Sequence, residues 1–430
     1  MQYKAQKGMK DILPAQSVKW RALEKVMRNV AKKAGYHEIR TPVLEQTELF
    51  SRSAGETSDV VKKEMYTFQD KGERSVTMKP ESTAGVVRAF LESGLYAQAL
   101  PCKLYYLFAP HYRYEAPQSG RLREHHQFGM ECFGAAMPSA DAELITQAIS
   151  VLETIGLENL SVRINSIGCP QCRPAYQQAF RTYLEEKKEC LCKTCQERMV
   201  TNPMRALDCK VSTCKDTLTD APTMLSYLCD ECNEHFSTLQ DLLKANAIDY
   251  AVDDRIVRGL DYYTKTVFEI ITQMPNGELT VCGGGRYDGL VKELGGPAMP
   301  AVGFGMGMER VLMLLDEVQN QKLVIDDETP DVFVATLNKS LSIHAFTLLQ
   351  QFRKAGLRAD MDHQSRSLKA QFKYADKLGS KMMAIIGDDE LAKGVIKLRN
   401  MITKEEWEVA LADAPTEVYN SLQSKEEHRG

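Results

Sequence analysis

Apolar and polar residues alternate along two short stretches that flank a basic loop in the first third of the chain. In the second stretch, Gln127, Gly129 and Glu131 project from one face, and apolar residues pack behind them. This period of two predicts a pair of strands over residues 103–113 and 124–134. Each strand is expected to have one polar face and one core face.

Before this pair of strands, the apolar residues follow the helical period of 3.6. They predict a helix over about residues 14–34, which Gly35 ends. The segment of residues 35–45 is extended and contains Pro42, which a central strand does not tolerate. We therefore expect an edge strand there, at a subunit contact, and a further helix that begins near Thr83.

Beyond the strand pair, the same signals predict more of this sheet and then a separate α/β unit. The elements expected in the first part are a helix at about 141–156, a strand at 162–165, a hairpin of 266–272 with 279–282, and a glycine-alternating strand at 301–307. Past an acidic linker, strands at 332–335 and 382–386 alternate with helices at about 340–355 and 367–378, and the tail from about residue 420 is expected to fray.

The composition is that of an ordinary globular protein of two or three domains, since 43% of the 430 residues are hydrophobic and 26% are charged. No apolar run approaches the roughly 18 residues that span a bilayer, so we expect a cytoplasmic protein with no membrane partner. The net charge of −4 does not by itself indicate a nucleic-acid partner, so any such binding must depend on local basic patches.

The loop between the two predicted strands is one such patch. Arg113 and Glu115 share a face at the end of the first strand, and Arg121 and Arg123 follow in the loop. Arginine forks bind phosphates bidentately, and a carboxylate on the polar floor can accept from an amine or an imidazole. The pattern favours a site for a polyphosphate beside a small cationic ligand, although an ordinary solvated hairpin carries the same residue types.

Nine of the twelve cysteines lie between Cys169 and Cys232. In a reducing compartment, C-x-x-C pairs indicate metal rather than disulfides. Two tetrahedral sites for structural Zn²⁺ could be built from eight of these residues: Cys169, Cys172, Cys192, Cys195, Cys209, Cys214, Cys229 and Cys232. The alternative is a set of free thiols packed as small hydrophobic side chains.

Two glycine-rich stretches, residues 283–289 and 301–307, match neither the dinucleotide-binding fingerprint nor the Walker phosphate loop, so both of those nucleotide folds are disfavoured. Instead, R-G-L-D-Y-Y at residues 258–263 and G-G-R-Y-D at residues 284–288 look like two histidine-specific signatures. On these the chain resembles the histidyl-tRNA synthetases, a class II aminoacyl-tRNA synthetase family.

The resemblance covers essentially the whole chain. The segments around Pro42, from Arg113 to Phe128 and from Gly303 to Arg310 are similar to class II motifs 1, 2 and 3. It implies an α+β fold with an antiparallel-sheet catalytic domain, an inserted helical domain and a C-terminal α/β anticodon-binding domain. The implied domains are the first catalytic part at 1–168, the cysteine-rich insertion at 169–247, the second catalytic part at 248–322, a linker at 323–330 and the anticodon-binding domain at 331–430.

The same resemblance implies a reaction. Histidine attacks the α-phosphorus of ATP, which Mg²⁺ accompanies, and the terminal ribose of tRNA(His) then takes the histidyl group. It also implies a homodimer. The alternative is a catalytically silent paralogue that regulates ATP phosphoribosyltransferase. Such paralogues typically lack the anticodon domain, whereas this chain has about 100 residues after Pro330 and keeps Arg113, Arg258 and Arg310.

Roles at ATP follow from the resemblance. Arg113 matches the arginine on the α-phosphate, and Arg310 the arginine on the γ-phosphate and the adenine face. Arg258 matches the family's catalytic arginine, which supplies positive charge at the α-phosphate where many class II relatives use a metal ion. The ATP-binding set is Arg113, Glu115, Arg121, His125 and Arg310.

Roles at histidine follow in the same way. Glu81, Thr83 and Gln127 match positions that hold the α-amino group, and Glu131 with Tyr263 matches the pair that grips the imidazole nitrogens. Arg258, Tyr262 and Tyr287 complete the histidine-binding set, and Gln118 with Arg123 falls on the loop that approaches the tRNA acceptor end. Without the resemblance, Glu81 and Thr83 read as residues that only stabilise a helix N-terminus, and Gln118 and Arg123 as a solvent-facing loop.

Some positions depart from the family pattern. Lys79 and Ser82 stand where bacterial relatives usually have arginine and glycine, and Ala116 replaces a common arginine that contacts tRNA phosphate. His125 stands where an aromatic residue usually stacks on adenine. Since imidazole titrates near neutral pH, ATP binding is expected to become pH-sensitive at His125.

Overall fold

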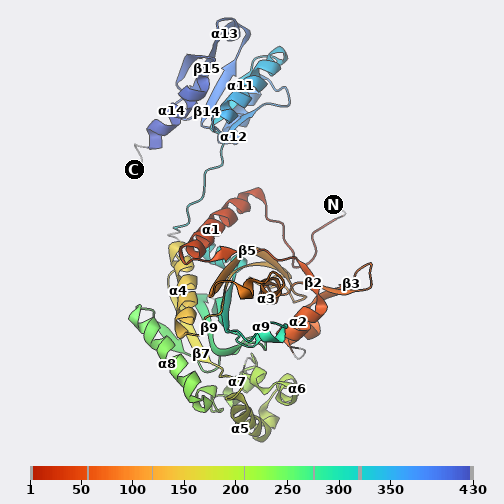
Figure 1. Cartoon of the computed structure of the whole chain (residues 1–430). Helices are drawn as coiled ribbons and strands as arrows, with labels where there is room; N and C mark the ends of the chain where they lie inside the picture. The colour runs from red at the N-terminus through yellow and green to blue at the C-terminus, as the bar shows by residue number, and fades with distance from the viewer. Residues whose placement is uncertain are drawn as a thin grey trace. The chain divides into compact units, whose positions relative to one another are not determined.

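The computed structural model describes residues 3–55, 58–118, 120–207, 209–274, 277–317 and 322–426. The chain divides into two compact units, Met1–Ile325 and Asp326–Gly430, and each is described by itself. Figure 1 shows the helices and strands of both.

An eight-stranded sheet forms the centre of the first unit, with the strand order β1-β5-β6-β11-β10-β9-β7-β8. Its strands are β1 (His37–Glu38), β5 (Cys102–Tyr112), β6 (Glu124–Phe133), β7 (Leu160–Ser166), β8 (Tyr250–Val252), β9 (Thr264–Met274), β10 (Gly277–Arg286) and β11 (Ala301–Gly307). The six central strands are antiparallel, and the outermost pairs β1·β5 and β7·β8 are parallel. The two predicted strands around the basic loop are confirmed as β5 and β6. Of the edge strand predicted within residues 35–45, only His37–Glu38 forms an edge of this sheet, as β1, and Pro42 lies outside the strands.

The predicted division of β6 into a core face and a polar face is also confirmed. Phe128, Met130 and Cys132 belong to one large hydrophobic core, together with residues of the covering helices. Figure 1 shows α1 (Pro14–Lys33), α4 (Pro138–Thr154) and α8 (Asp230–Ala245) along this side of the sheet. The helix predicted at about 14–34 is therefore α1, and the helix predicted at about 141–156 is α4.

The opposite face of the sheet carries a second core, to which α3 (Thr83–Glu92) contributes Val86, Val87 and Phe90. A three-stranded sheet in the order β2-β4-β3 lies in the same unit. The remaining elements there are β2 (Leu44–Gln46), β3 (Tyr66–Gln69), β4 (Ser75–Met78), α2 (Thr47–Ala54), α9 (Leu290–Glu293), α10 (Met308–Glu317), the π-helical turn η1 (Val60–Glu64) and the 3₁₀ turn η2 (Leu95–Ala97).

The cysteine-rich stretch is helical, as predicted, and has a small core of its own. Tyr176, Phe180 and Leu184 from one helix pack there against eight buried or half-buried cysteines and neighbouring apolar residues. Before α8, its elements are α5 (Arg173–Glu186), η3 (Lys188–Cys190), α6 (Lys193–Thr201), η4 (Pro203–Ala206), α7 (Ser212–Thr217) and η5 (Met224–Tyr227). The chain leaves the sheet after β7 and returns to it at β8, so this stretch is an excursion from the sheet.

The second unit is a five-stranded sheet in the order β13-β12-β14-β15-β16, covered by helices. Its elements are β12 (Val332–Thr336), η6 (Lys339–Leu341), α11 (Ser342–Lys354), β13 (Ala359–Met361), α12 (Leu368–Lys377), β14 (Met382–Ile386), α13 (Asp388–Ala392), β15 (Val395–Asn400), β16 (Glu406–Ala410) and α14 (Ala414–Glu426).

The sequence analysis found only part of this second unit. The predictions of β12, β14, α11 and α12 are confirmed, whereas β13, β15, β16, α13 and α14 were missed. The expected fraying from about residue 420 is wrong within the described residues, because α14 continues to Glu426 and buries Val418 in the core.

Within the described ranges, no helix combines the length and the apolar character that crossing a membrane would require.

Candidate active site

The polar face of β6 lies against glycines of the neighbouring strand. In the register of β6 and β11, Glu131 stands opposite Gly303, and Gln127 stands opposite Gly307. A Cβ atom at Gly303 would overlap the Glu131 carboxyl group, and a Cβ at Gly305 would come within 3.0 Å of Gln127 Oε1. The alternating glycines of β11 therefore leave room for two long polar side chains to lie on the sheet.

Glu131 is fully buried in the middle of this face. The Thr83 hydroxyl donates to its Oε1 over 2.8 Å, and the Tyr287 hydroxyl donates to its Oε2. Burial raises the pKa of Glu131 to about 8, against the opposing effect of these two hydrogen bonds. At neutral pH the group is mainly a neutral acid.

Three tyrosines gather beside Glu131. The ring of Tyr262 lies 4.7 Å from that of Tyr263 and 5.6 Å from that of Tyr287, measured between ring centroids, and all three side chains are buried. Tyr262 and Tyr263 belong to the signature stretch before β9, and Tyr287 belongs to the signature stretch at the end of β10. The structure thus brings both signatures to Glu131.

Glu81 and Thr83 lie at the start of α3 but do different things. The Glu81 carboxylate accepts from the backbone N–H of Thr83 over 2.7 Å and of Ala84 over 2.9 Å, so it stabilises the helix N-terminus. The Thr83 side chain instead reaches Glu131. Glu81 therefore stabilises the start of α3, whereas the Thr83 side chain contacts the buried carboxyl group of Glu131.

Arg258 lies at the border of this group. Its guanidinium pairs with Glu269 and stands 5.9 Å from the centre of the Tyr263 ring. A Cβ at Gly283 would overlap the guanidinium, so this glycine gives Arg258 its place on the sheet. One side of Arg258 therefore touches the tyrosine group, while the other side touches a carboxylate of β9.

Further arginines gather around the basic loop. Arg113 donates to Pro80 O over 2.9 Å, and Arg121 pairs with Glu115 at 3.2 Å. Arg310 donates to Gly120 O over 3.0 Å and to Thr280 O over 2.6 Å. The loop is thereby tied to α10 and β10, and its cations come from segments that are far apart in the sequence.

His125 is the second residue of β6, close to the basic loop. Its ring lies 5.4 Å from that of the buried His111, whose Nε2 is 2.7 Å from Ser82 Oγ. Burial, together with the charges of Arg113 and Arg310, lowers the pKa of His125 to about 3. The expected pH sensitivity at His125 is therefore wrong near neutrality, because the ring stays uncharged there.

Gln118 and Arg123 differ in how firmly the loop holds them. Arg123 lies over the Tyr114 ring at 4.0 Å and donates to Glu115 O over 3.0 Å. Gln118 is exposed, and its backbone exchanges hydrogen bonds with Arg121 across the turn. Arg123 is thus part of the loop's framework, and Gln118 faces solvent.

The eight predicted cysteine ligands form two groups of four. Within each group the sulfur atoms all lie within 4.8 Å of one another, and the groups are Cys169, Cys172, Cys229 and Cys232, and Cys192, Cys195, Cys209 and Cys214. In the first group, Cys172 Sγ accepts from the backbone N–H of Cys229 over 3.1 Å. In the second, Cys214 Sγ accepts from that of Cys192 over 3.2 Å. Backbone donors of this kind stabilise thiolates.

Sequence reasoning missed several residues that complete the site. Glu269, which pairs with Arg258 and accepts from the Thr280 hydroxyl over 3.2 Å, is one of them. Its signal was a single acidic residue among the four apolar residues at the centre of β9. Tyr106 is another, since its buried ring fills the space above Gly129. No local pattern distinguishes Tyr106 from an ordinary core residue.

Two family models match this chain. The model described as histidyl-tRNA synthetase matches residues 8–311, and the model described as anticodon binding domain matches residues 331–420. Between them they take in nearly the whole length.

Individual relatives match over nearly the full length as well. The histidine–tRNA ligase of Caldanaerobacter subterraneus subsp. tengcongensis is 51% identical over 417 residues, covering 97% of this chain and 99% of the relative. That of Clostridioides difficile is 48% identical over 424 residues, with coverage of 97% and 99%. Among solved structures, apo S. aureus histidyl-tRNA synthetase gives a TM-score of 0.81 at 36% identity and covers 97% of this chain and 99% of its own.

The raised pKa of Glu131 makes a prediction for stability. The folded protein holds a proton that the unfolded chain, with a pKa near 4.5, releases. The contribution of Glu131 to stability is therefore complete below about pH 4.5 and is lost as the pH rises towards 8. Relative to Glu131→Gln, the free energy of unfolding of the unsubstituted protein should fall by up to about 1.4 kcal/mol per pH unit in this window.

Denaturant unfolding of both proteins at pH 5.5, 6.5 and 7.5, without substrates, measures this difference. A difference that stays constant across the three conditions would contradict the assignment of a proton to Glu131.

Proposed function

The chain belongs to the histidyl-tRNA synthetase family, and from that membership together with the site geometry we infer that it ligates L-histidine to tRNA(His). Histidine first attacks the α-phosphorus of ATP, giving histidyl-adenylate and pyrophosphate. The terminal ribose of the tRNA then takes the histidyl group. ATP is a substrate, and Mg²⁺ accompanies it as in aminoacyl-tRNA synthetases generally.

The observation that carries this inference is the buried carboxyl group of Glu131 between Thr83 and Tyr287. An imidazole has a separate donor or acceptor at each ring nitrogen, so a carboxyl group and a tyrosine hydroxyl can satisfy both. Because the pKa of Glu131 is about 8 and that of imidazole is ordinarily about 6.5, a shared proton can reside on either partner.

Such a site also rejects other amino acids. A side chain of similar size without ring nitrogens would leave Glu131 buried beside it without a new partner, which is costly. We therefore propose that Glu131 with Tyr263 grips the imidazole, with Tyr262 and Tyr287 around it. Thr83, Gln127 and Glu81 are proposed at the α-amino group, Glu81 by fixing the start of α3 as well as by its charge.

ATP is proposed to bind along the arginines at the border of this site. Arg113 and Arg258 act at the α-phosphate, while Arg310 and Arg121 act at the outer phosphates. The transition state collects negative charge on the equatorial oxygens of phosphorus, and guanidinium groups that are already held in place stabilise it without reorganisation. The ion pair with Glu269 supports this role for Arg258, since it fixes the cation before substrate arrives. Glu115 positions Arg121, and the uncharged ring of His125 stacks on adenine.

The regulatory paralogue of ATP phosphoribosyltransferase is not favoured. The ligases named above align with 97% of this chain, and the anticodon-binding model matches residues 331–420. A protein that only binds histidine needs neither that domain nor the arginines around the basic loop.

Contacts with tRNA are proposed at both units. The second unit would bind the anticodon, in keeping with its family model, and Gln118 and Arg123 would approach the acceptor end. We keep the division into catalytic parts at 1–168 and 248–322, an insertion at 169–247, a linker at 323–330 and an anticodon-binding domain at 331–430 as a proposal. A homodimer is proposed as well, with support from the exposed Leu44 and Phe68 on β2 and β3.

Structural Zn²⁺ is proposed at both cysteine groups. A tetrahedral site with Zn–S bonds of about 2.3 Å places its sulfur atoms roughly 3.8 Å apart. The sulfur of Cys169 lies 3.5 Å from that of Cys172 and 3.9 Å from that of Cys229, and Cys192 lies 3.9 Å from Cys209. Four thiolates would fill the coordination shell, so each ion would hold the inserted helices together and take no part in the reaction.

Arg258→Ala tests the proposed chemistry. Losing one preorganised cation at the α-phosphate should slow adenylate formation by about 10² to 10³. Rapid-quench measurement of a single turnover with saturating histidine and ATP reports this step. Arg255→Ala is the matched control, since Arg255 is exposed three residues away and lies outside the site. A near-normal rate for Arg258→Ala would remove Arg258 from the mechanism.

Elemental analysis of untagged protein tests the zinc proposal. Two Zn²⁺ per chain are expected, one of which should be lost in Cys209→Ser with Cys214→Ser, and the other in Cys229→Ser with Cys232→Ser. Cys190→Ser is the control, because Cys190 is exposed and belongs to neither group. A protein with no zinc above the buffer level would refute the proposal.

A further inference from the structure

Arg286 is fully buried, and each N–H of its guanidinium has a partner. Nε donates to Asp141 Oδ2 over 2.9 Å and also faces His235 Nε2 at 3.3 Å. One terminal nitrogen donates to Ala135 O over 2.9 Å and to Asp288 Oδ1 over 3.3 Å. The other donates to Met137 O over 2.9 Å and to Asp141 Oδ2 over 2.6 Å.

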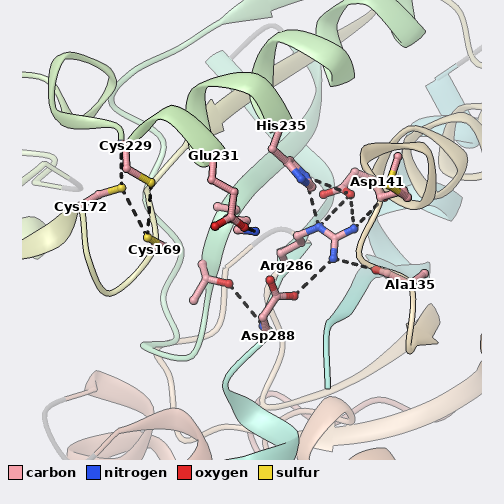
Figure 2. A network of polar contacts seen from close by, with 12 residues as sticks. Ala135, Asp141, Cys169, Cys172, Cys229, Glu231, His235, Arg286 and Asp288 are labelled. Carbon is pink, nitrogen blue, oxygen red and sulfur yellow. Dashed lines mark hydrogen bonds and ion pairs between the residues drawn. The ribbon is translucent and has the colours of Figure 1, made fainter. Parts of the chain in front are cut away.

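These partners come from four separate parts of the fold, as Figure 2 shows. Ala135 and Met137 lie in the connection from β6 to α4, and Asp141 lies in the first turn of α4. His235 belongs to α8, which starts directly after the cysteine ligand Cys229. One cation therefore joins the sheet, the helix that covers it and the last helix of the cysteine-rich stretch.

Arg286 is connected to both partners of the hydrogen bond between Tyr287 and Glu131, which lies at the centre of the proposed histidine site. Glu131 lies on β6, four residues before the Ala135 carbonyl that Arg286 binds. Tyr287 directly follows Arg286, and its backbone N–H donates to Ala301 O over 2.8 Å. Asp288 Oδ1 in turn accepts from the backbone N–H of Ala301 over 3.1 Å. The relative placement of Glu131 and Tyr287 thus depends on what holds Arg286.

We propose that Asp141, His235 and Arg286 are positioning residues for histidine recognition. Through them, α8 of the cysteine-rich stretch fixes the Tyr287 hydroxyl on the Glu131 carboxyl group. The proposal rests on the function proposed above and goes beyond it, since none of the three residues reaches the site itself.

The chemistry of the cluster suits such a role. A buried ion pair adds little net stability compared with apolar packing, because removing two charges from water costs about as much as their attraction returns. A buried network of directional hydrogen bonds does, however, favour one arrangement of its members, and here all the contacts from Arg286 to Asp141 converge on Oδ2, while Oδ1 has no hydrogen-bond partner among the described residues. His235 matters in particular, since it is the member contributed by the inserted helices, and its Nε2 lies 3.3 Å from Arg286 Nε and 3.4 Å from Asp141 Oδ2.

A purely structural role would have different consequences. If the cluster only stabilised the fold, weakening it would lower the unfolding temperature and leave the Michaelis constants of surviving molecules unchanged. If it positions Tyr287 and Glu131, the Michaelis constant for histidine should rise while that for ATP does not. ATP is proposed to bind along a different set of residues, the arginines of the basic loop and α10.

Histidine-dependent exchange of pyrophosphate into ATP measures both constants. His235→Ala and Asp141→Asn should each raise the Michaelis constant for histidine by about tenfold, within the range that network residues contribute, and change that for ATP by less than about twofold. His235→Gln should lie closer to the unsubstituted protein, because its side-chain oxygen can accept from Arg286. Asp141→Asn and His235→Gln keep the shape of the cluster, so the test does not depend on His235→Ala folding.

Glu231→Ala is the matched control. Glu231 lies one turn before His235 on α8 and also ties this helix to the sheet, through Lys265 at 2.6 Å, but its side chain is 72% exposed. It should leave both constants unchanged.

Two outcomes would overturn the proposal: unchanged Michaelis constants in His235→Ala and Asp141→Asn, or an equal rise for histidine and ATP. Glu131→Gln, measured in parallel, separates this failure from failure of the function. If Glu131→Gln raises the constant for histidine and the cluster variants do not, only the positioning role falls. If Glu131→Gln has no effect either, the histidine site itself is misplaced.

Discussion

The carboxyl group of Glu131 lies in the middle of an eight-stranded sheet, away from water, and the surroundings must compensate for that burial. A side chain of this length can lie flat on a sheet only where the next strand has no side chain, which Gly303 provides. Thr83 and Tyr287 then supply the hydrogen bonds that a buried oxygen needs. The buried carboxyl group thus depends on three segments: the glycine-alternating strand β11 gives it space, and the start of α3 and the segment after β10 give it hydrogen bonds.

The cations of the site are subject to a second constraint. Arginines placed close together repel one another, so each is held by its own acceptor: Arg258 by Glu269, Arg121 by Glu115, and Arg310 by backbone carbonyls. These local pairs fix the guanidinium groups before a ligand arrives. A polyphosphate would meet charges already in position, which is the condition for electrostatic stabilisation of a transition state.

The period-two pattern of β6 was enough to predict its polar face, because alternation depends only on local geometry. The strand at 301–307 was predicted too, but its pairing with β6 was not, since the register that places Glu131 opposite Gly303 joins residues that are far apart in sequence. The roles of Glu81 and Thr83 were ambiguous for the same reason. Glu81 caps the helix, and the role of Thr83 becomes clear only because Glu131, which is distant in sequence, accepts a hydrogen bond from its hydroxyl. The expected titration of His125 failed because burial, which the sequence does not reveal, decides its charge.

The most direct test of the account is histidine-dependent exchange of labelled pyrophosphate into ATP, with each of the other amino acids as a control. The account predicts exchange with histidine alone, since an imidazole has a donor or acceptor at each ring nitrogen to pair with the proposed carboxyl group and tyrosine hydroxyl. Exchange supported equally by other amino acids would contradict the specificity assigned to Glu131. A folded protein that binds histidine and shows no exchange would contradict its role as a ligase.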